Sequence, residues 1–518
     1  MTVLGARWRA DRVRAVSAGG LVALAAADAA LATVAPLPAL AAALGATFGV
    51  GALASHRSAA TIFGGGLVLV LAGYAFFDRG FAYVGVFPVY IGEGVLALGA
   101  VAFLGALRRA RFGPLHALLL AYMAWGLART LPYVGVYGFD AFRDGVLWIY
   151  ALFAIFLSVV VEPRHLRAAI DLYRRFLPLF LLWVPVGALV ISPIQDALPK
   201  IPGTNVPIIV WKDGDVAVHL AGIAAFVLLG LYASTSLRRA VSESVLWILW
   251  LVDAGLAASQ NRGGLLAMSA VSAVLVFARS SARWMRAALV GALLVVLLLV
   301  ANPSIQLGAA GSRSLSFEQV LNNVSSIFND TGSSSLQDTK AWRLAWWNKI
   351  ISYTANGPYF WQGKGFGINL ANDDGFQVNA DQSLRAPHND HLNILARTGV
   401  PGLVLWILVQ VTFAATMLLG AYRAWTVGAK RWVALIGWLF VYWAAAMVNM
   451  SFDVYLDGPQ GGIWFWAVVG LGMAAVARAP RPGRVEPDVV AALDPVDPSE
   501  APPPATPAPR GPIPEGAA

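Results

Sequence analysis

The chain has 518 residues, of which 58% are hydrophobic, 13% are charged and none is cysteine, so disulfides, thiolate metal sites and thiol catalysis are excluded. A soluble domain carries about 25% charged residues, and a chain this long and apolar cannot cover itself with polar surface, so we predict an all-α, polytopic membrane protein. The formal net charge of +9 is spread over short segments between apolar runs, which is the pattern of membrane topology rather than the contiguous basic patch of a nucleic-acid-binding protein.

Apolar runs long enough to cross the hydrocarbon core, which takes about 20 helical residues, occur about 14 times. The N-terminal run has basic flanks and no clear cleavage site, so it is interpreted as a first membrane helix rather than a removed signal peptide. The predicted spans are residues 16–35, 37–55, 60–77, 84–107, 114–132, 144–162, 172–193, 217–234, 241–258, 263–279, 284–302, 399–420, 432–450 and 461–477.

Basic residues recur in alternate turns between these spans. If the N-terminal "RWRADRVR" is cytoplasmic, every cytoplasmic turn is basic, from "RRAR" (108–111) to "RAPRPGR" (478–484). This agreement with the positive-inside rule predicts an even number of spans and two cytoplasmic termini.

The predicted spans divide the chain into four parts. Residues 1–302 hold the first eleven spans, 303–398 form one large outer loop, and 399–477 hold the last three spans. A loop this long is usually functional or has structure of its own. Residues 478–518, rich in Pro and Ala, are predicted to be a disordered cytoplasmic tail.

The outer loop contains two distinctive segments in its second half. "AWRLAWWNKIISY" (341–353) places Trp342, Trp346 and Ile350 at helical spacing, which predicts either a helix at the membrane interface or a small packed helix in a soluble cap. "GPYFWQGKGFG" (357–367) lacks the Lys-Ser/Thr ending of a phosphate-binding loop, so its glycines predict a tight backbone turn.

The loop closes with "APHNDHL" (386–392), which holds two of the six histidines. Asn389 is the predicted N-cap of a short helix, because its side-chain oxygen can accept hydrogen bonds from free backbone amides. That helix should break at Gly399 and continue as a span from Pro401. His388 would then lie at the mouth of a helix, just above the outer membrane face.

The same spacing is equally compatible with a purely structural role. Asn389 and Asp390 would then cap the helix, while the histidines make ordinary loop hydrogen bonds. A metal site needs three or four ligands. Since His388 and His391 have no further His or Cys cluster to complete such a site, no metal site is predicted.

Six cationic residues are predicted on the outer side, where positive charge runs against the topology bias. A charge near the end of an apolar span is costly unless it faces a cavity or a partner, or reaches lipid headgroups. Together these residues predict a cationic outer cavity, and the paired donors of guanidinium suit a phosphorylated or pyrophosphorylated lipid-linked ligand. The six residues are Arg129, Arg143, Lys212, Arg262, Arg343 and Arg385.

Three segments resemble the O-antigen ligase and O-antigen polymerase-like (Wzy_C-type) membrane glycosyltransferases. "NRGGLLA" (261–267) is similar to the family's Ser-Arg-Gly segment at the outer end of a membrane helix. "WRLAWWNKIISYTANGPYFWQGKGFG" (342–367) resembles the Arg…Trp…Pro…Gly-x-Gly run of the large periplasmic loop. "PHNDHLNILARTGVPGL" (387–403) resembles the His-Asn…Leu…Gly-x-x-Gly end of that loop. With the topology, the resemblance covers about residues 60–477.

The resemblance implies a GT-C-like helical bundle in a bacterial inner membrane, whose site faces the periplasm. Such an enzyme transfers a glycan from an undecaprenyl-pyrophosphate carrier to an acceptor hydroxyl of a glycan, lipid or protein, without a nucleotide sugar or an obligatory metal. His388 would be the base-like residue at the acceptor hydroxyl, and Arg143 and Arg262 would hold the donor pyrophosphate. The other substrate-binding residues that we expect are Lys212, Arg385, Asn389, His391, Arg343 and Arg129.

The chain departs from the family pattern at two positions. Asn261 stands where the family commonly has Ser, and Ala386 replaces a His that many ligases carry two residues before the His-Asn pair. His391 follows the pair instead. The second departure bears on the type of acceptor.

The chemistry of these residue types agrees with glycan transfer. Pyrophosphate leaves readily when its developing charge is neutralised, which arginines can do in a water-poor site. A neutral histidine, with a reference pKa of about 6.5, can take the proton of an acceptor hydroxyl. We therefore predict direct inverting displacement at the sugar C1 atom.

Other functions are compatible with parts of this pattern. A polysaccharide polymerase or a protein O-oligosaccharyltransferase would share the same residues and differ only in the acceptor. A lipid-linked oligosaccharide transporter would need repeated halves or paired discontinuous helices, and the sequence shows no internal repeat. A purely structural or sensory membrane protein would leave the outer arginines unexplained.

Overall fold

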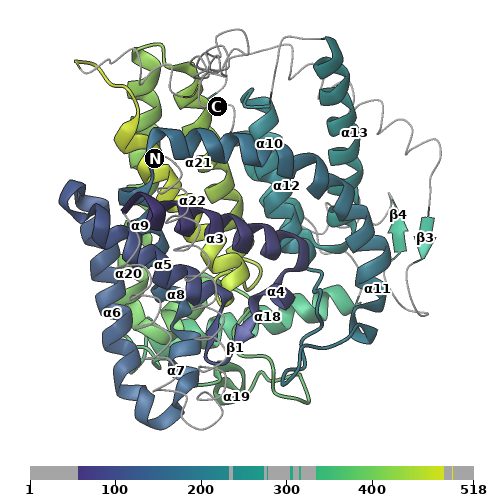
Figure 1. Ribbon diagram of the computed structural model, residues 1–518. Helices are drawn as coiled ribbons and strands as arrows, with labels where there is room; N and C mark the ends of the chain where they lie inside the picture. The colour runs from purple at the N-terminus through teal and green to yellow at the C-terminus, as the bar shows by residue number, and fades with distance from the viewer. Residues whose placement is uncertain are drawn as a thin grey trace, which may run out of the picture.

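The computed structural model describes residues 56–232, 237–273, 277, 304–306, 314–316, 334–483 and 493. Over these residues the chain is a bundle of helices with two short β-hairpins, which confirms the predicted all-α fold class (Figure 1). The predicted spans 16–35, 37–55 and 284–302, and nearly all of the tail beyond residue 483, lie outside the described residues.

The helices and strands are as follows in chain order. The first part contains α3 (His56–Phe77), α4 (Arg79–Ala82), β1 (Gly85–Val86), β2 (Val89–Tyr90), α5 (Ile91–Ala106), α6 (Pro114–Tyr137), α7 (Phe139–Asp144), α8 (Val146–Ile149), α9 (Ala151–Val160) and α10 (Pro163–Val186). It continues with α11 (Ser192–Ile194), α12 (Asp213–Leu228), α13 (Leu237–Gln260) and α14 (Arg262–Ser269). The second part contains β3 (Ser304–Gln306), β4 (Ser314–Ser316), α18 (Ser334–Thr354), α19 (Leu370–Asp374), α20 (Asp390–Thr426), α21 (Lys430–Met450) and α22 (Pro459–Arg478).

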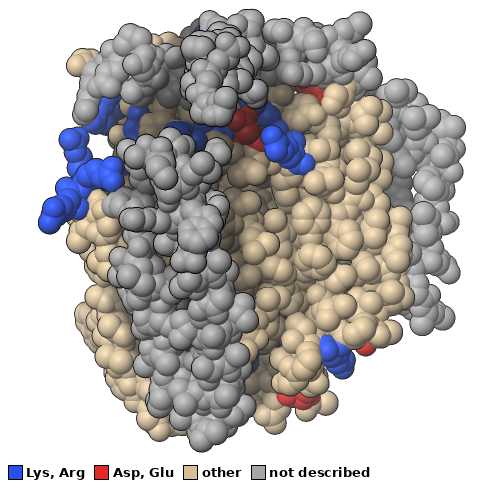
Figure 2. Space-filling model, in the orientation of Figure 1, with Lys and Arg blue, Asp and Glu red and all other residues tan. Residues whose placement is uncertain are grey.

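Eight of the described helices are long and apolar enough to cross a membrane. Charged side chains on the face shown in Figure 2 gather at its two ends, and an apolar band lies between them. Lipid tails offer no hydrogen bonds to a chain, which favours helices whose backbone groups are satisfied internally. The chain is therefore a polytopic membrane protein. The eight segments are Ala59–Phe77, Ile91–Arg109, Pro114–Tyr137, Pro163–Ala197, Ser242–Gln260, Asp390–Thr426, Lys430–Met450 and Pro459–Arg478.

Several predicted spans differ in their boundaries from the described helices, and three of these differences have a clear local cause. The span 84–107 opens with the β1–β2 hairpin, so its helix starts only at Ile91. The span 144–162 is divided among α7, α8 and α9, and its continuous apolar helix runs over Val146–Val160. The span 217–234 ends early because Gly230, with a φ of 79°, turns the chain after α12.

A sharp kink at Gly399 divides α20 into a short first helix and a long second one. The φ of Gly399 is 70°, and a Cβ atom there would lie 2.5 Å from the Phe360 carbonyl oxygen. Only glycine fits such a backbone conformation at such a close approach. The predicted break between a short helix and a span is thereby confirmed.

The second half of the large loop folds into a small core of its own. Trp346 and Ile350 of α18 are fully buried and pack with Leu370 of α19 and with Leu395 and Ala396 of α20. The Trp346 indole N–H donates to Asp374 Oδ2 at 2.8 Å. The structure therefore agrees with the packed-helix interpretation of segment 341–353.

The glycine-rich segment 357–367 is the predicted tight turn. Gly363, Gly365 and Gly367 all have positive φ values, of 60°, 81° and 101°. A Cβ on Gly363 would lie 2.4 Å from the Arg397 carbonyl carbon, so the turn lies directly against α20. This contact fixes the loop core to the start of the last membrane helices.

Figure 1 places α7, α18, α19 and β1 together at one end of the bundle, which we call the loop end. α22 starts there, because Asp457 just before it accepts a hydrogen bond from Asn393 Nδ2 at 2.7 Å. It finishes at Arg478, which donates to the Ser158 carbonyl near the end of α9 at 3.0 Å. We call that second level of the bundle the opposite end.

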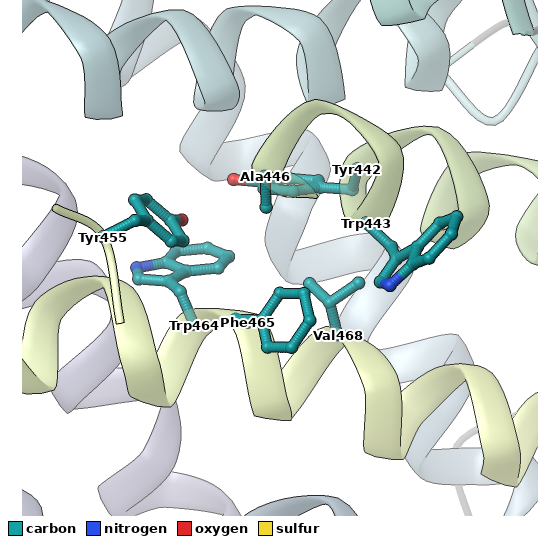
Figure 3. Close-up of a pocket in the computed structure, with 7 residues that line it drawn as sticks. All are labelled: Tyr442, Trp443, Ala446, Tyr455, Trp464, Phe465 and Val468. Carbon is teal, nitrogen blue, oxygen red and sulfur yellow. The ribbon is translucent and has the colours of Figure 1, made fainter. Parts of the chain in front are cut away.

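An aromatic seam holds α21 and α22 together (Figure 3). The Trp464 indole of α22 stacks on the Tyr442 ring of α21 with centroids 5.6 Å apart, and Tyr455 lies beside Trp464. Phe465 and Val468 complete the seam, which has no room for a water molecule between these described residues. We interpret this seam as hydrophobic packing between α21 and α22 rather than as a binding site.

Candidate functional site

The conformation of His388 is set by the start of α20. Asn389 is the N-cap, as predicted, and its Oδ1 accepts from the Leu392 backbone N–H at 3.0 Å. Its Nδ2 donates to the Ser451 carbonyl at 2.9 Å, which ties the helix start to the segment after α21. His388 itself has a φ of 52°. Positive φ is uncommon outside glycine and concentrates at functional sites.

His388 belongs to a group of four residues that we call the histidine cluster: His388, Asp453, Lys212 and Asp215. The His388 Nδ1 lies 3.5 Å from Asp453 Oδ1. The Lys212 ammonium lies 3.5 Å from Asp453 Oδ2 and 3.2 Å from Asp215 Oδ1, and it also donates to the Val454 carbonyl. The His388 side chain remains 31% exposed, so an incoming molecule can reach it.

The electrostatics of the cluster keep Asp453 ionised. Burial alone would raise the pKa of the Asp453 carboxyl, but the Lys212 ammonium and the neighbouring His388 outweigh burial and hold that pKa below its ordinary value. Burial would likewise lower the pKa of Lys212, but the carboxylates of Asp215 and Asp453 raise it above its usual range. Lys212 and Asp453 are therefore a charged pair at neutral pH.

The start of α14 packs against this cluster. Asn261 caps α14 through its Oδ1, which accepts from the Gly264 N–H at 3.0 Å. A Cβ on Gly214 would lie 3.1 Å from Asp453 Oδ2 and 3.2 Å from Asn261 Nδ2, so these two polar atoms converge on one point. Arg262 is the first residue of α14 and thus stands next to the cluster along the backbone, while its side chain is outside the described ones.

α18 contributes a cation and an aromatic ring to the surroundings of the histidine cluster. Arg343 Nη1 donates to the Phe452 carbonyl at 2.8 Å, directly before Asp453 in the chain. Burial lowers the pKa of Arg343, and the Asp453 carboxylate counteracts that effect. The Trp342 ring meets the His388 imidazole edge to face, with centroids 6.4 Å apart. His388 is thus enclosed by segments from four distant parts of the chain.

A second group, the arginine cluster, lies where the loop core meets α7. It consists of Asp140, Arg143, Asp144, Arg385 and Arg397. Asp144 is its centre, with Oδ2 at 2.9 Å from Arg385 Nη2 and 3.0 Å from Arg397 Nη1. Its Oδ1 lies 3.5 Å from Arg143 Nε. Arg143 and Arg385 also face Asp140, at 3.3 and 3.5 Å.

Asp144 stays ionised because of these arginines. Burial would raise the pKa of its carboxyl, but Arg397 and Arg385 outweigh burial and hold that pKa below the ordinary value. Arg397 is fully buried and also donates to Asn393 Oδ1 at 2.9 Å. Removing one partner of such a buried pair costs roughly 3–5 kcal/mol, so this pair holds the loop core on the bundle.

The segment 451–458 between α21 and α22 connects the two clusters. Its Asp453 belongs to the histidine cluster, and its Asp457 meets the arginine cluster through Asn393. Asp390, the first residue of α20, accepts from the Tyr455 and Leu456 N–H groups at 2.9 and 2.8 Å. Arg385 and His388 are three positions apart in the chain, so their Cα atoms are at most about 11 Å apart. The two clusters thus lie near each other at the loop end.

Two of the predicted site residues make other contacts. His391 accepts from the Trp406 indole N–H at 3.1 Å and lies 3.4 Å from the Met447 carbonyl, which places it in the packing between α20 and α21. Arg129 donates to the Gln362 carbonyl at 2.7 Å and lies over the Tyr133 ring. The His391 contacts hold α20 against α21, and the Arg129 contact holds the glycine-rich turn against α6.

Sequence comparison gives an independent finding on the same region. Residues 244–407 match the family model of the O-antigen ligases. Residues 244–407 are a domain of the O-antigen ligase family. No curated protein sequence matches the chain significantly.

The O-antigen ligase domain contains part of the site described above. Arg262, Arg343, Arg385 and His388 lie within it, and the buried Arg397 does also. The carboxylate partner Asp453 follows the domain, and Lys212, Arg143 and Asp144 precede it. The remaining helices therefore supply the charged partners of the residues that the domain contributes.

Sequence reasoning missed several residues of the two clusters. Arg397 could have been found, because it is the only charged residue in the apolar run "NILARTGVPGLVLW" (393–406) of the second part of the chain. Asp144 and Asp453 carried no such signal, because acidic residues in outer loops are common. Among the described residues, no group of three His, Asp or Glu side chains is arranged to hold a metal ion.

Proposed function

We propose that the protein is a membrane glycosyltransferase that moves a glycan from an undecaprenyl-pyrophosphate carrier to an acceptor hydroxyl. The observation that carries this proposal is the geometry of His388. It is partly exposed, has a positive φ, and lies beside an ionised carboxylate at the loop end of an O-antigen ligase domain. The same end would face the periplasm of a bacterial inner membrane, and the chain termini would be cytoplasmic.

Asp453 selects the tautomer of His388 that the reaction needs. If the Nδ1–H donates to the Asp453 carboxylate, the neutral ring has its free lone pair on Nε2. Nε2 then takes the proton of the acceptor hydroxyl as its oxygen attacks the sugar C1. The C1–oxygen bond to the pyrophosphate breaks, its electron pair stays on the phosphate oxygen, and the configuration at C1 inverts. General-base assistance of this kind contributes typically 10²–10⁴-fold to a rate.

Arginines supply the charge that the leaving pyrophosphate requires. Arg262 at the start of α14 and the half-exposed Arg143 of α7 are proposed as the donor-binding pair. Arg343, which donates to the Phe452 carbonyl next to Asp453, and Arg385, three positions before His388 in the chain, are proposed as further donor-binding residues. Guanidinium groups have a geometry that matches phosphate oxygens. Asn389, His391, Lys212 and Arg129 are proposed to hold this site in shape.

The test is transfer by the purified, full-length protein. It is incubated with a polyprenyl-pyrophosphate-linked glycan and candidate acceptors, and release of the carrier pyrophosphate is measured. We expect release to require an acceptor and to fall at least about 100-fold in His388→Gln. The matched control is His116→Gln, because His116 contacts Ser158 at the opposite end.

Two results would contradict the proposal. Carrier release by His388→Gln at the wild-type rate would remove His388 from the reaction. Translocation of the intact lipid-linked glycan without any carrier release would instead identify a transporter. The acceptor that becomes glycosylated distinguishes a ligase from a polymerase or a protein O-oligosaccharyltransferase.

A further inference from the structure

A polar cavity of about 210 Å³ lies at the opposite end of the bundle, away from the proposed reaction. Its walls come from the ends of α5, α9 and α22 and from the starts of α3 and α10. A water molecule occupies about 30 Å³, so the cavity has room for a phosphodiester group. Its charged and polar lining residues are Arg109, Glu162, Arg164, His165 and Arg478.

The charges around this cavity do not balance. Within the described part of the lining, Glu162 is the single carboxylate, at 3.6 Å from Arg109 Nη1 and 2.9 Å from Arg164 Nη2. Arg478 hydrogen-bonds to the Ser158 and Val159 carbonyls, which orient its guanidinium but do not neutralise it. Among the described residues of the lining, three guanidiniums are therefore present against one carboxylate.

The cavity lies at the level of lipid headgroups. α22 has 20 residues and therefore spans about 30 Å, which is the thickness of a hydrocarbon core. Its start lies at the loop end and its last residue, Arg478, lines the cavity. The side chains of Arg109 and Arg164 are 65% and 60% exposed, so a ligand can reach them from outside.

We infer that this cavity binds the phosphate headgroup of an anionic phospholipid from the leaflet opposite the loop end. Guanidinium forks hydrogen-bond phosphate oxygens in pairs, and basic pockets between membrane helices suit anionic headgroups. His165 adds a donor, because its Nδ1 accepts from the Glu162 backbone N–H at 3.0 Å and the neutral ring then carries its proton on Nε2. This inference is independent of glycan transfer.

The test measures lipid binding to the full-length protein in detergent by native mass spectrometry. Phosphatidylglycerol is titrated against phosphatidylcholine, for wild type and for the double variant Arg109→Ala/Arg164→Ala. Each arginine near a headgroup contributes about a fivefold change in affinity, so we expect phosphatidylglycerol to bind about 25-fold more weakly to the double variant. Glu162→Gln removes the carboxylate that faces Arg109 and Arg164, and this variant should bind phosphatidylglycerol more tightly than wild type.

The control is the double variant Arg108→Ala/Arg111→Ala, whose two exposed arginines lie in the same segment but outside the cavity lining. If both double variants lose the same affinity for phosphatidylglycerol, general surface charge explains the binding and the inference is overturned. If wild type binds phosphatidylcholine as tightly as phosphatidylglycerol, annular lipid explains the binding and the inference is likewise overturned. Displacement of the lipid by inorganic phosphate at matched concentration would identify a free-anion site instead. If a double variant fails to fold, an unchanged affinity in Glu162→Gln still refutes the site.

Discussion

At the scale of single residues, Lys212 is placed to act on the site through its carboxylate neighbours. Its ammonium lies between Asp215 and Asp453, so its charge is already neutralised by carboxylates. These contacts favour a role in holding Asp453 ionised beside His388. The expectation that Lys212 binds the donor directly remains a prediction, but its surroundings give it a second task.

Replacing Lys212 by methionine should change the pH dependence of transfer. The pKa of Asp453 is held below its ordinary value, so the ionised carboxylate stabilises the folded site above about pH 4 and this contribution is lost only as pH falls further. In Lys212→Met the dominant effect left is burial, which raises the pKa of Asp453. We therefore expect the acidic limb of the pH–rate profile to move to higher pH, while the rate above that limb is less affected.

The measurement is the rate of carrier release between pH 4 and pH 8 for wild type and variant. Lys200→Met is the matched control, because Lys200 is exposed in the same outer segment and its side chain has no ionic partner among the described residues. An unshifted acidic limb in Lys212→Met would exclude the proposed coupling to Asp453. A uniform loss of rate at every pH would indicate a purely structural role.

At the scale of elements, the start and the break of the α20 helix could be predicted from the sequence, whereas the contacts between distant segments at the loop end could not. Asn389 and Gly399 act through their own backbone neighbours, so helix start and break could be predicted from a dozen residues. Asp453 and His388 are 65 positions apart in the sequence, yet their side chains are in contact. That contact results from packing α20 against the segment after α21, and no periodicity in either segment encodes it.

The kink of α20 should be essential to this arrangement. In Gly399→Ala the new Cβ would lie 2.5 Å from the Phe360 carbonyl oxygen, in addition to the strain of a φ of 70°. Strain of this kind costs about 1–3 kcal/mol, and the backbone clash adds to it. We expect a clearly lower melting temperature in detergent together with reduced transfer, because the first helix of α20 carries the N-cap that positions His388.

The control variant Gly428→Ala introduces the backbone strain of a positive φ without the steric clash expected in Gly399→Ala. Gly428 has a comparable φ of 75°, but nothing lies within 4 Å of its Cβ position and it follows the far end of α20. This variant should lose some stability and retain transfer. Equal loss of transfer in both variants would show that the kink does not act through the site.

At the scale of the whole molecule, apolar run length accounts for most of the bundle, because a membrane leaves few alternatives to a helix. The boundaries in 84–107 and 144–162 were less predictable, since a hairpin and helix breaks there depend on packing at the loop end. The charge asymmetry of the turns further predicts that the loop end faces the periplasm and the opposite end faces the cytoplasm.

The absence of cysteine allows this orientation to be tested without background labelling. Single cysteines are placed at Asp381, which is exposed in the large loop, and at Arg423, which is exposed near the end of α20. α20 runs from the loop end through a kinked helix of 37 residues, so the two positions should lie on opposite sides of the membrane. A membrane-impermeant maleimide should label Asp381→Cys in cells with a permeabilised outer membrane. Arg423→Cys should react only after the inner membrane is opened. The reverse labelling pattern would place the proposed site in the cytoplasm and would contradict transfer on the periplasmic side.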